Sequence, residues 1–172
     1  MLAGVAAAAR AARLGPVFLV TSEPTATVLG ARFAVGVISD GDLPWNEGLV
    51  HAVDSMIPAP SAVLYLSGDL PLVTAADIRA FVDIAPPRGV AIARAHDGGT
   101  NALLLRPPKA IHPLFGQQPS AARHAASAAA DGFDSRVADI DGLALDVDTI
   151  SDLRIAQAGW AARRLIRQRV SG

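Results

Sequence analysis

The chain has 172 residues, of which 51% are hydrophobic and only 5% aromatic, so we expect one domain over residues 1–172 with a core of Ala, Val, Leu and Ile. The formal net charge of −1 gives no general attraction to nucleic acid or to an anionic membrane surface. The absence of cysteine excludes disulfides and thiolate metal sites, and no apolar run approaches the length of a membrane span.

The first element is rich in Ala and contains Arg but no acidic residue, so a targeting peptide has to be weighed against an ordinary helix. A secretory signal carries its positive charge before the apolar stretch, whereas Arg10 and Arg13 follow it. We therefore predict an ordinary helix over residues 2–13, ended by Gly15 and Pro16, and a cytoplasmic protein.

Short apolar runs bounded by turn residues then alternate with helical patterns, which predicts a three-layer α/β domain with helices covering a parallel sheet. The predicted strands are residues 17–20, 34–38, 62–66, 90–94, 102–105 and 143–147. The predicted helices after the first are residues 23–30, 46–56, 74–84, 120–130 and 149–169. The turn between the strands at 90–94 and 102–105 is consistent with either an antiparallel or a crossed pairing there.

Two of these helices carry further local signals. Thr74 and Thr149 are each followed three residues later by Asp, the spacing of an amino-terminal cap. The last helix has an apolar stripe, which we expect to face the core rather than a partner. Its members are Leu153, Ala156, Trp160 and Leu165.

Three carboxylates follow predicted strands. Asp69, in the run Leu-Ser-Gly-Asp-Leu-Pro at 66–71, should emerge at the carboxyl end of a strand buried on both faces, where α/β sheets bind ligands. The two-residue period of the strand at 143–147 points Asp146 and Asp148 the same way. Mg²⁺ is typically held by one or two carboxylates plus substrate phosphates, which suggests phosphoryl or nucleotidyl transfer. Alternatively, Gly-Asp is a turn and Asp148 belongs to a helix cap, which leaves Asp146 unexplained.

Three further segments carry residues suited to a nucleotide and an anionic acceptor. Asn46 stands at a helix start, where it could also be a simple cap. Residues 98–101, Gly-Gly-Thr-Asn, allow close backbone approach to a ligand but also fit a hairpin turn. Residues 115–120 precede a helix whose first amides could bind phosphate or carboxylate, with Arg123 and His124 one turn later. For His124 we favour a structural hydrogen bond over acid-base chemistry.

Taken in order, these segments resemble the 2-phospho-L-lactate and phosphoenolpyruvate guanylyltransferases of deazaflavin coenzyme (coenzyme F420) biosynthesis, within the nucleotidyltransferase fold that includes molybdenum cofactor guanylyltransferases. The likeness covers most of the chain, and the order of its motifs is more specific than any one of them. The motifs here are Asn46, Gly68 to Pro71, Gly99 with Thr100, Phe115 and Gly116 with Ser120 and His124, and Asp146 to Thr149.

The resemblance implies a three-layer nucleotidyltransferase-like fold and a magnesium-dependent reaction between GTP and a small phosphorylated carboxylic acid, with release of pyrophosphate. The acid would be 2-phospholactate, phosphoenolpyruvate or 3-phosphoglycerate. The implied roles are Asp69, Asp146 and Asp148 for magnesium, Thr100, Gly116 and Ser120 for the acceptor, and Asn46 with the Ser67 and Gly68 backbone for the nucleotide.

The chain also departs from the family pattern. Family members begin with a strand and a basic loop that wraps the triphosphate, whereas this chain begins at what looks like the following helix, so we expect a shortened sheet that a homodimer could cover. The segment around Gly116 is one residue longer than the pattern, and Pro44 and Trp45 before Asn46 are unusual. The alternatives are a nucleotidyltransferase for another nucleotide or a sugar phosphate, and a non-catalytic relative that acts as a binding or partner domain.

Overall fold

The computed structural model of the chain describes the backbone of residues 1–170 and the side chains of residues 1–161. Helices and strands alternate along most of this length. The helices are α1 (Leu2–Ala12), α2 (Ala26–Phe33), α3 (Trp45–Asp54), α4 (Ala75–Asp83), α5 (Ser120–Ala130), α6 (Asp141–Ala144) and α7 (Ile150–Val170). The strands are β1 (Phe18–Val20), β2 (Gly36–Ile38), β3 (Val63–Leu66), β4 (Gly89–Arg94), β5 (Thr100–Arg106) and β6 (Asp134–Ala138).

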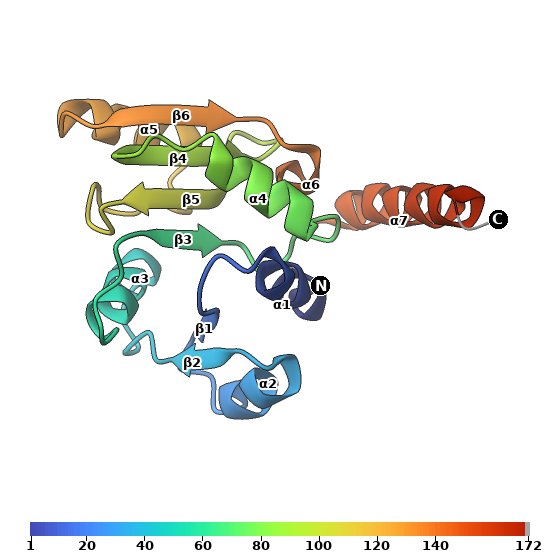
Figure 1. The fold of residues 1–172 in the computed structure, drawn as a ribbon, viewed down its shortest axis with the longest axis horizontal. Helices are drawn as coiled ribbons and strands as arrows, with labels where there is room; N and C mark the ends of the chain where they lie inside the picture. Colours follow the sequence, from blue (N-terminus) through green and yellow to red (C-terminus); the bar gives the residue numbers. More distant parts are fainter. Residues whose placement is uncertain (171–172) are drawn as a thin grey trace.

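The strands form two sheets, and in Figure 1 the smaller sheet lies below the larger one. Four strands pair in the order β3-β5-β4-β6, and β1 pairs in parallel with β2 in the second sheet. β5 runs antiparallel to both of its neighbours, while β4 and β6 are parallel, so β3, β4 and β6 share one direction. The sheet is therefore mixed, with three of its four strands in one direction, and the antiparallel pairing of the strands around residues 90–94 and 102–105 is confirmed.

Helices cover both faces of the four-stranded sheet, which confirms the three-layer architecture. The two-residue period of β4 sends Val90 and Ile92 to one face, where they pack with α3 and α5. Ala91 and Ala93 face the opposite side, where they pack with side chains of α1, α4 and α6. β4 and β5 are almost wholly buried, since they lie between these layers and between neighbouring strands.

Both predicted helix caps are present. Thr74 and Asp77 form a reciprocal capping box at the start of α4, with the Asp77 backbone N–H donating to the Thr74 hydroxyl oxygen at 3.2 Å. Thr149 and Asp152 make the same pair of contacts before α7. These local bonds satisfy amides that the first turn of a helix leaves without partners.

Two predictions about strands were wrong. Residues 143–147 do not form a strand, because Leu143 and Ala144 belong to the short helix α6 and the residues that follow pair with no strand. The strand β6 was missed, because its residues Asp-Ser-Arg-Val-Ala lie at the sheet edge, largely exposed, and lack an apolar pattern. β3 also lies at an edge and is half-buried rather than enclosed on both faces.

The apolar stripe of α7 faces the core only in part. Ala156 is fully buried, but Leu153 is 37% and Trp160 is 43% exposed, because α7 extends away from the sheets (Figure 1). The prediction was therefore wrong for these two residues, and the side chain of Leu165 lies outside the described residues. Within the described part of the chain, no helix is both long and apolar enough to cross a membrane.

Candidate active site

The candidate site lies where the carboxyl end of β3 meets the amino end of β5. The antiparallel register places Leu66 opposite Ala102, so the residues that follow β3 lie beside the residues that begin β5. The backbone N–H of Ser67 donates to the Asn101 carbonyl at 2.9 Å and extends this pairing. The sheet therefore brings Asp69 close to Thr100, although 31 positions separate them in the chain.

Asp69 occupies a turn after β3 and is half-buried. Its Oδ1 atom is buried and has no hydrogen-bond partner. Burial raises the pKa of this carboxyl group, and the negative charges of Asp146 and Asp148 raise it further. The charges of Asp146 and Asp148 therefore act on Asp69 across this region.

These carboxylates suit a hard divalent cation chemically, because an unpartnered buried oxygen beside further acidic groups is what such an ion neutralises. In the part of the chain that the structure describes, however, no group of three or more His, Cys, Asp or Glu side chains lies close enough together to hold a metal ion. Mg²⁺ needs only one or two protein carboxylates, since water and substrate phosphates complete its shell. A magnesium site at Asp69, Asp146 and Asp148 stays a prediction.

Asn101 positions the segment that carries Asp146 and Asp148. Its side chain is 1% exposed, and its Nδ2 donates to the Leu143 carbonyl at 2.9 Å. The His96 backbone N–H donates to the Ala144 carbonyl at 3.0 Å, so both bonds anchor α6 just before the extended acidic stretch. This role of Asn101 was not predicted, although a polar residue inside an apolar strand was a usable signal.

His124 is a fully buried histidine whose hydrogen bonds determine its tautomer. The backbone N–H of Leu114 donates to Nε2 at 2.8 Å, so Nε2 carries no hydrogen and the neutral ring carries it on Nδ1. Burial lowers the pKa of His124 to about 4, and the nearby backbone of Ser120 acts in the opposite direction. The ring is therefore neutral near pH 7 and donates from Nδ1.

Thr100 receives that hydrogen. Its hydroxyl oxygen lies 3.0 Å from His124 Nδ1 and also accepts from the Ser120 hydroxyl at 3.0 Å. Thr100, Ser120 and His124 are 6%, 2% and 0% exposed, so bulk water competes little for these bonds. Because both neighbours donate, the hydroxyl hydrogen of Thr100 is left to donate to a fourth group, such as an anionic oxygen.

Asn46 ties the start of α3 to the segment before α5. Its Nδ2 donates to the Phe115 carbonyl at 3.1 Å, and its Oδ1 accepts from the Phe115 backbone N–H at 2.9 Å. Asn46 therefore holds the loop that contains Gly116, and contact with a nucleotide stays a prediction.

The remaining predicted site residues lie at the surface of this region. Gly116 is exposed and has a φ of +75°, a conformation that Gly adopts without strain. Gly68 is exposed and Ser67 half-buried, and the Ser67 amide is already bonded to Asn101. Asp97 joins this loop to the turn before β5, because it accepts from the Gly99 backbone and from the Gln118 side chain.

At the start of α5, no side chain caps the helix, and the Ala121 backbone N–H donates to the Gly98 carbonyl at 3.3 Å. That bond occupies one of the amides that the sequence offered to an anion, and it fixes the helix start against the turn before β5. The anion-binding part of the site therefore depends on side-chain hydroxyls as well as on helix amides.

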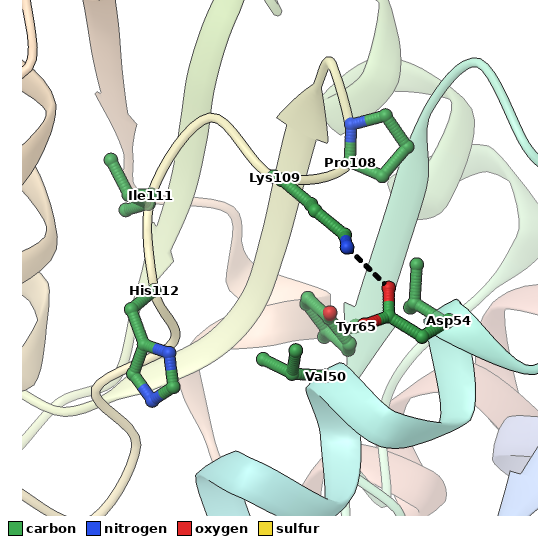
Figure 2. Close-up of a pocket in the computed structure, with 8 residues that line it drawn as sticks. Val50, Asp54, Tyr65, Pro108, Lys109, Ile111 and His112 are labelled. Carbon is green, nitrogen blue, oxygen red and sulfur yellow. Dashed lines mark ion pairs between the residues drawn. The ribbon is translucent and has the colours of Figure 1, made fainter.

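Two hollows lie near this site without containing its predicted residues. The first is a pocket of about 240 Å³ between α3, β3 and the segment after β5 (Figure 2). At its edge Lys109 Nζ lies 2.7 Å from Asp54 Oδ1, near Tyr65. Burial and, to a smaller extent, the charge of Asp54 raise the pKa of Tyr65 to about 12. The pocket lies at the carboxyl end of α3, whereas Asn46 stands at its amino end.

The second hollow, of about 490 Å³, lies beyond the carboxyl end of β4. Its lining includes Asp97, Asp139 and Asp141. Arg94 also lines it, but the guanidinium of this residue is already paired with Asp139 by two hydrogen bonds of 3.0 and 2.7 Å. This acidic lining does not favour a phosphorylated acid, so the Thr100 hydroxyl is the better anchor for such a molecule.

Comparison with known proteins gives matches over most of the chain. A family model described as "Guanylyl transferase CofC like" matches residues 1–158. Phosphoenolpyruvate guanylyltransferase from Sphaerobacter thermophilus is 40% identical over 156 residues, which are 89% of this chain and 75% of that protein. 2-phospho-L-lactate guanylyltransferase from Methanothermobacter thermautotrophicus is 37% identical over 114 residues, 66% of this chain and 50% of that protein.

Among solved structures, a nucleotidyl transferase from Methanothermobacter is similar with a TM-score of 0.68. The two sequences are 20% identical, and the match covers 93% of this chain and 80% of the other. At this identity the likeness establishes the α/β nucleotidyltransferase fold.

Proposed function

Because the chain belongs to the CofC-like guanylyl transferase family, whose members are nucleotidyltransferase enzymes, we propose that it joins GTP to a small phosphorylated carboxylic acid. Phosphoenolpyruvate is the first acceptor to test, since the Sphaerobacter relative is named for it. 2-phospho-L-lactate, named in the Methanothermobacter relative, and 3-phosphoglycerate are the next. The product acid would carry a guanosine group through a diphosphate link, as a step in making a deazaflavin coenzyme.

The observation that carries this proposal is the buried hydrogen-bond chain at Thr100. Thr100 accepts from Ser120 and His124, so its own hydroxyl can donate to an oxygen of the acceptor's phosphate or carboxylate. The geometry of the donor is set before the ligand arrives, because all three side chains are buried and bonded. Such preorganisation favours both binding and orientation of the acceptor.

In the proposed reaction an oxygen of the acceptor phosphate attacks the α-phosphorus of GTP. A bond forms between them, the bond from the α-phosphorus to the bridging oxygen breaks, and pyrophosphate leaves with that electron pair. No side chain forms a covalent intermediate, so the chain contributes by positioning and by electrostatics. Thr100 and Ser120 would orient the acceptor, and Gly116 would let the backbone approach it.

Asp69, with Asp146 and Asp148, would hold Mg²⁺, which when bound neutralises negative charge on the reacting phosphates. The unpartnered Oδ1 of Asp69 is the structural support for this part of the proposal. Neither nucleic acid nor a membrane is needed as a partner. A homodimer would be compatible with the same chemistry.

The test is release of pyrophosphate from GTP, magnesium and each of the three acids, with mass spectrometry of the product. We expect Asp69→Asn to lower the rate by a factor of about 10² to 10³ or more, because it removes a charge where phosphate charge develops. The matched control is Asp83→Asn, which neutralises an exposed carboxylate on α4 and should retain activity. Equal loss in both variants, or full activity in Asp69→Asn, would contradict the assignment of Asp69.

A further inference from the structure

Trp45, the first residue of α3, is a large aromatic side chain that the fold leaves 61% exposed. One face of its indole stacks on Phe115, with ring centroids 5.6 Å apart and planes inclined by 28°. Phe115 is buried and makes edge contacts with Tyr65 and His124. The indole therefore rests on the aromatic part of the core, while much of its remaining surface is open.

The position of the Trp45–Phe115 stack is fixed by neighbouring contacts. Asn46, the residue after Trp45, forms two hydrogen bonds with the Phe115 backbone. These bonds hold the start of α3, with Trp45, against the residue whose ring the indole stacks on. Gly116 lies at the edge of the indole, since a Cβ at this glycine would stand 3.4 Å from Trp45 Cζ3. An exposed indole held in this way loses little conformational entropy when a ligand stacks on it.

The Trp45–Phe115 stack also borders the candidate active site. Phe115 and Gly116 belong to the loop that leads into α5, and Ser120 at the start of that helix donates to Thr100. The His124 ring, which contacts Phe115, donates to Thr100 as well. The Trp45–Phe115 stack is therefore connected to the Thr100 hydroxyl through the His124 ring and through the segment that leads to Ser120.

The chemistry of an indole face distinguishes between the two proposed substrates. An aromatic face carries a negative quadrupole, so it does not attract a small acid that bears a phosphate and a carboxylate. A nucleobase has its own π-face and stacks on aromatic side chains. We propose that Trp45 binds the guanine base of GTP by stacking, an inference that rests on the proposed function because it takes GTP as the nucleotide.

Binding is tested by fluorescence, because the chain has only two tryptophans. Trp160→Phe leaves Trp45 as the only tryptophan, which can be excited selectively, and Trp45→Phe leaves Trp160 and serves as the matched control for absorption by the ligand. We expect GTP and guanosine to quench Trp45 saturably and to leave the Trp45→Phe variant unchanged beyond the absorption correction. Quenching by inorganic triphosphate or by phosphoenolpyruvate alone, or none with GTP, would overturn the assignment.

Kinetics then separate stacking from simple packing. Trp45→Leu keeps an apolar cover on Phe115 but has no π-face, whereas Trp45→Phe keeps an aromatic ring. We expect Trp45→Leu to raise the KM for GTP by about 5- to 100-fold, with the acceptor KM unchanged, and Trp45→Phe to retain most of the affinity. An unchanged GTP KM in Trp45→Leu, or an increase confined to the acceptor KM, would refute stacking.

The two proposals fail in distinguishable ways. If GTP quenches Trp45 but no acid yields pyrophosphate, the stacking stands and guanylyl transfer to these acids fails. If transfer proceeds and Trp45→Leu has normal kinetics, the transferase stands and the stacking fails. Thermal unfolding followed by circular dichroism identifies any variant that does not fold. If a Trp45 variant does not fold, the titration of Trp160→Phe still tests stacking, because that variant keeps Trp45.

Discussion

Replacement of His124 by Gln should remove a pH dependence of stability that the wild-type chain shows in mild acid. In the folded chain burial lowers the pKa of His124 from 6.5 to about 4. Above pH 6.5 the ring is neutral in both states and makes no pH-dependent contribution. As the pH falls from 6.5 toward 4, the unfolded chain binds a proton that the folded chain does not, so stability is lost across this window.

The size of this effect follows from the two pKa values. At about 1.4 kcal/mol per pH unit, the full loss is about 3 kcal/mol, and most of it has occurred by about pH 4.5. Domains of this size are stable by roughly 5–15 kcal/mol, so such a loss is large enough to measure. The main cause is burial of the ring, and protonation at Nε2 would also break the bond from the Leu114 amide.

The assay is urea unfolding at about pH 7.5 and about pH 4.5, followed by circular dichroism. His124→Gln is expected to be less stable at the higher pH by about 1–3 kcal/mol, because a buried ring and its hydrogen bonds are lost. The difference between variant and wild type should then shrink by about 2–3 kcal/mol at the lower pH. His112→Gln, at an exposed histidine, is the control and should follow the wild type. Parallel pH profiles for wild type and His124→Gln would refute the reasoning.

Two further predictions concern single contacts. Thr100→Val removes the hydroxyl that both Ser120 and His124 donate to, so the KM for the acceptor should rise by about 10- to 100-fold with little change in the KM for GTP. Thr100→Ser keeps the hydroxyl and should retain most of the affinity for the acceptor. Steady-state kinetics that show equal effects on both substrates would contradict this prediction. Gly142→Ala places a Cβ against the carboxylate of Asp77 and should lower the free energy of unfolding by about 1–3 kcal/mol. Gly4→Ala is the control, because the added Cβ meets no atom within 4 Å and the free energy of unfolding should not fall. Urea unfolding of the two variants measures the difference.

The parts of the fold that sequence could predict are those with strong local signals. The capping box of α4 needs only Thr74 and Asp77, which lie three residues apart, so its geometry follows from the helix itself. The apolar runs of β4 and β5 are almost wholly buried, and such strands are continuous rather than alternating in hydrophobicity. Both signals are independent of the rest of the chain.

The errors came from segments whose conformation depends on distant partners. α6 packs closely against α4, since Gly142 lies where a side chain would overlap Asp77, and its end is bonded to Asn101. Neither contact can be read from the local sequence, which instead offered an apolar run typical of a strand. The polar strand β6 forms because β4 presents a free edge to it, and not because of its own pattern.

The candidate site shows the same division. The family resemblance assigned Thr100 and Ser120 to the acceptor, and the structure joins these two side chains and His124 by hydrogen bonds, while binding of an acceptor there stays a prediction. What sequence could not provide was the role of Asn46, because its partner Phe115 is 69 positions away. The preference for a structural role of His124 agrees with its bonds to Leu114 and Thr100.

The two halves of the site differ in how they are stabilised. The half around Thr100 is built from neutral, buried groups that are already hydrogen-bonded, so its geometry does not depend on a ligand. The half around Asp69 gathers negative charges, and Oδ1 of that residue has no partner, so repulsion and desolvation oppose its closure. An added cation would offset that repulsion. The acceptor side is therefore expected to be preorganised in the free protein, whereas the acidic side should tighten when positive charge arrives.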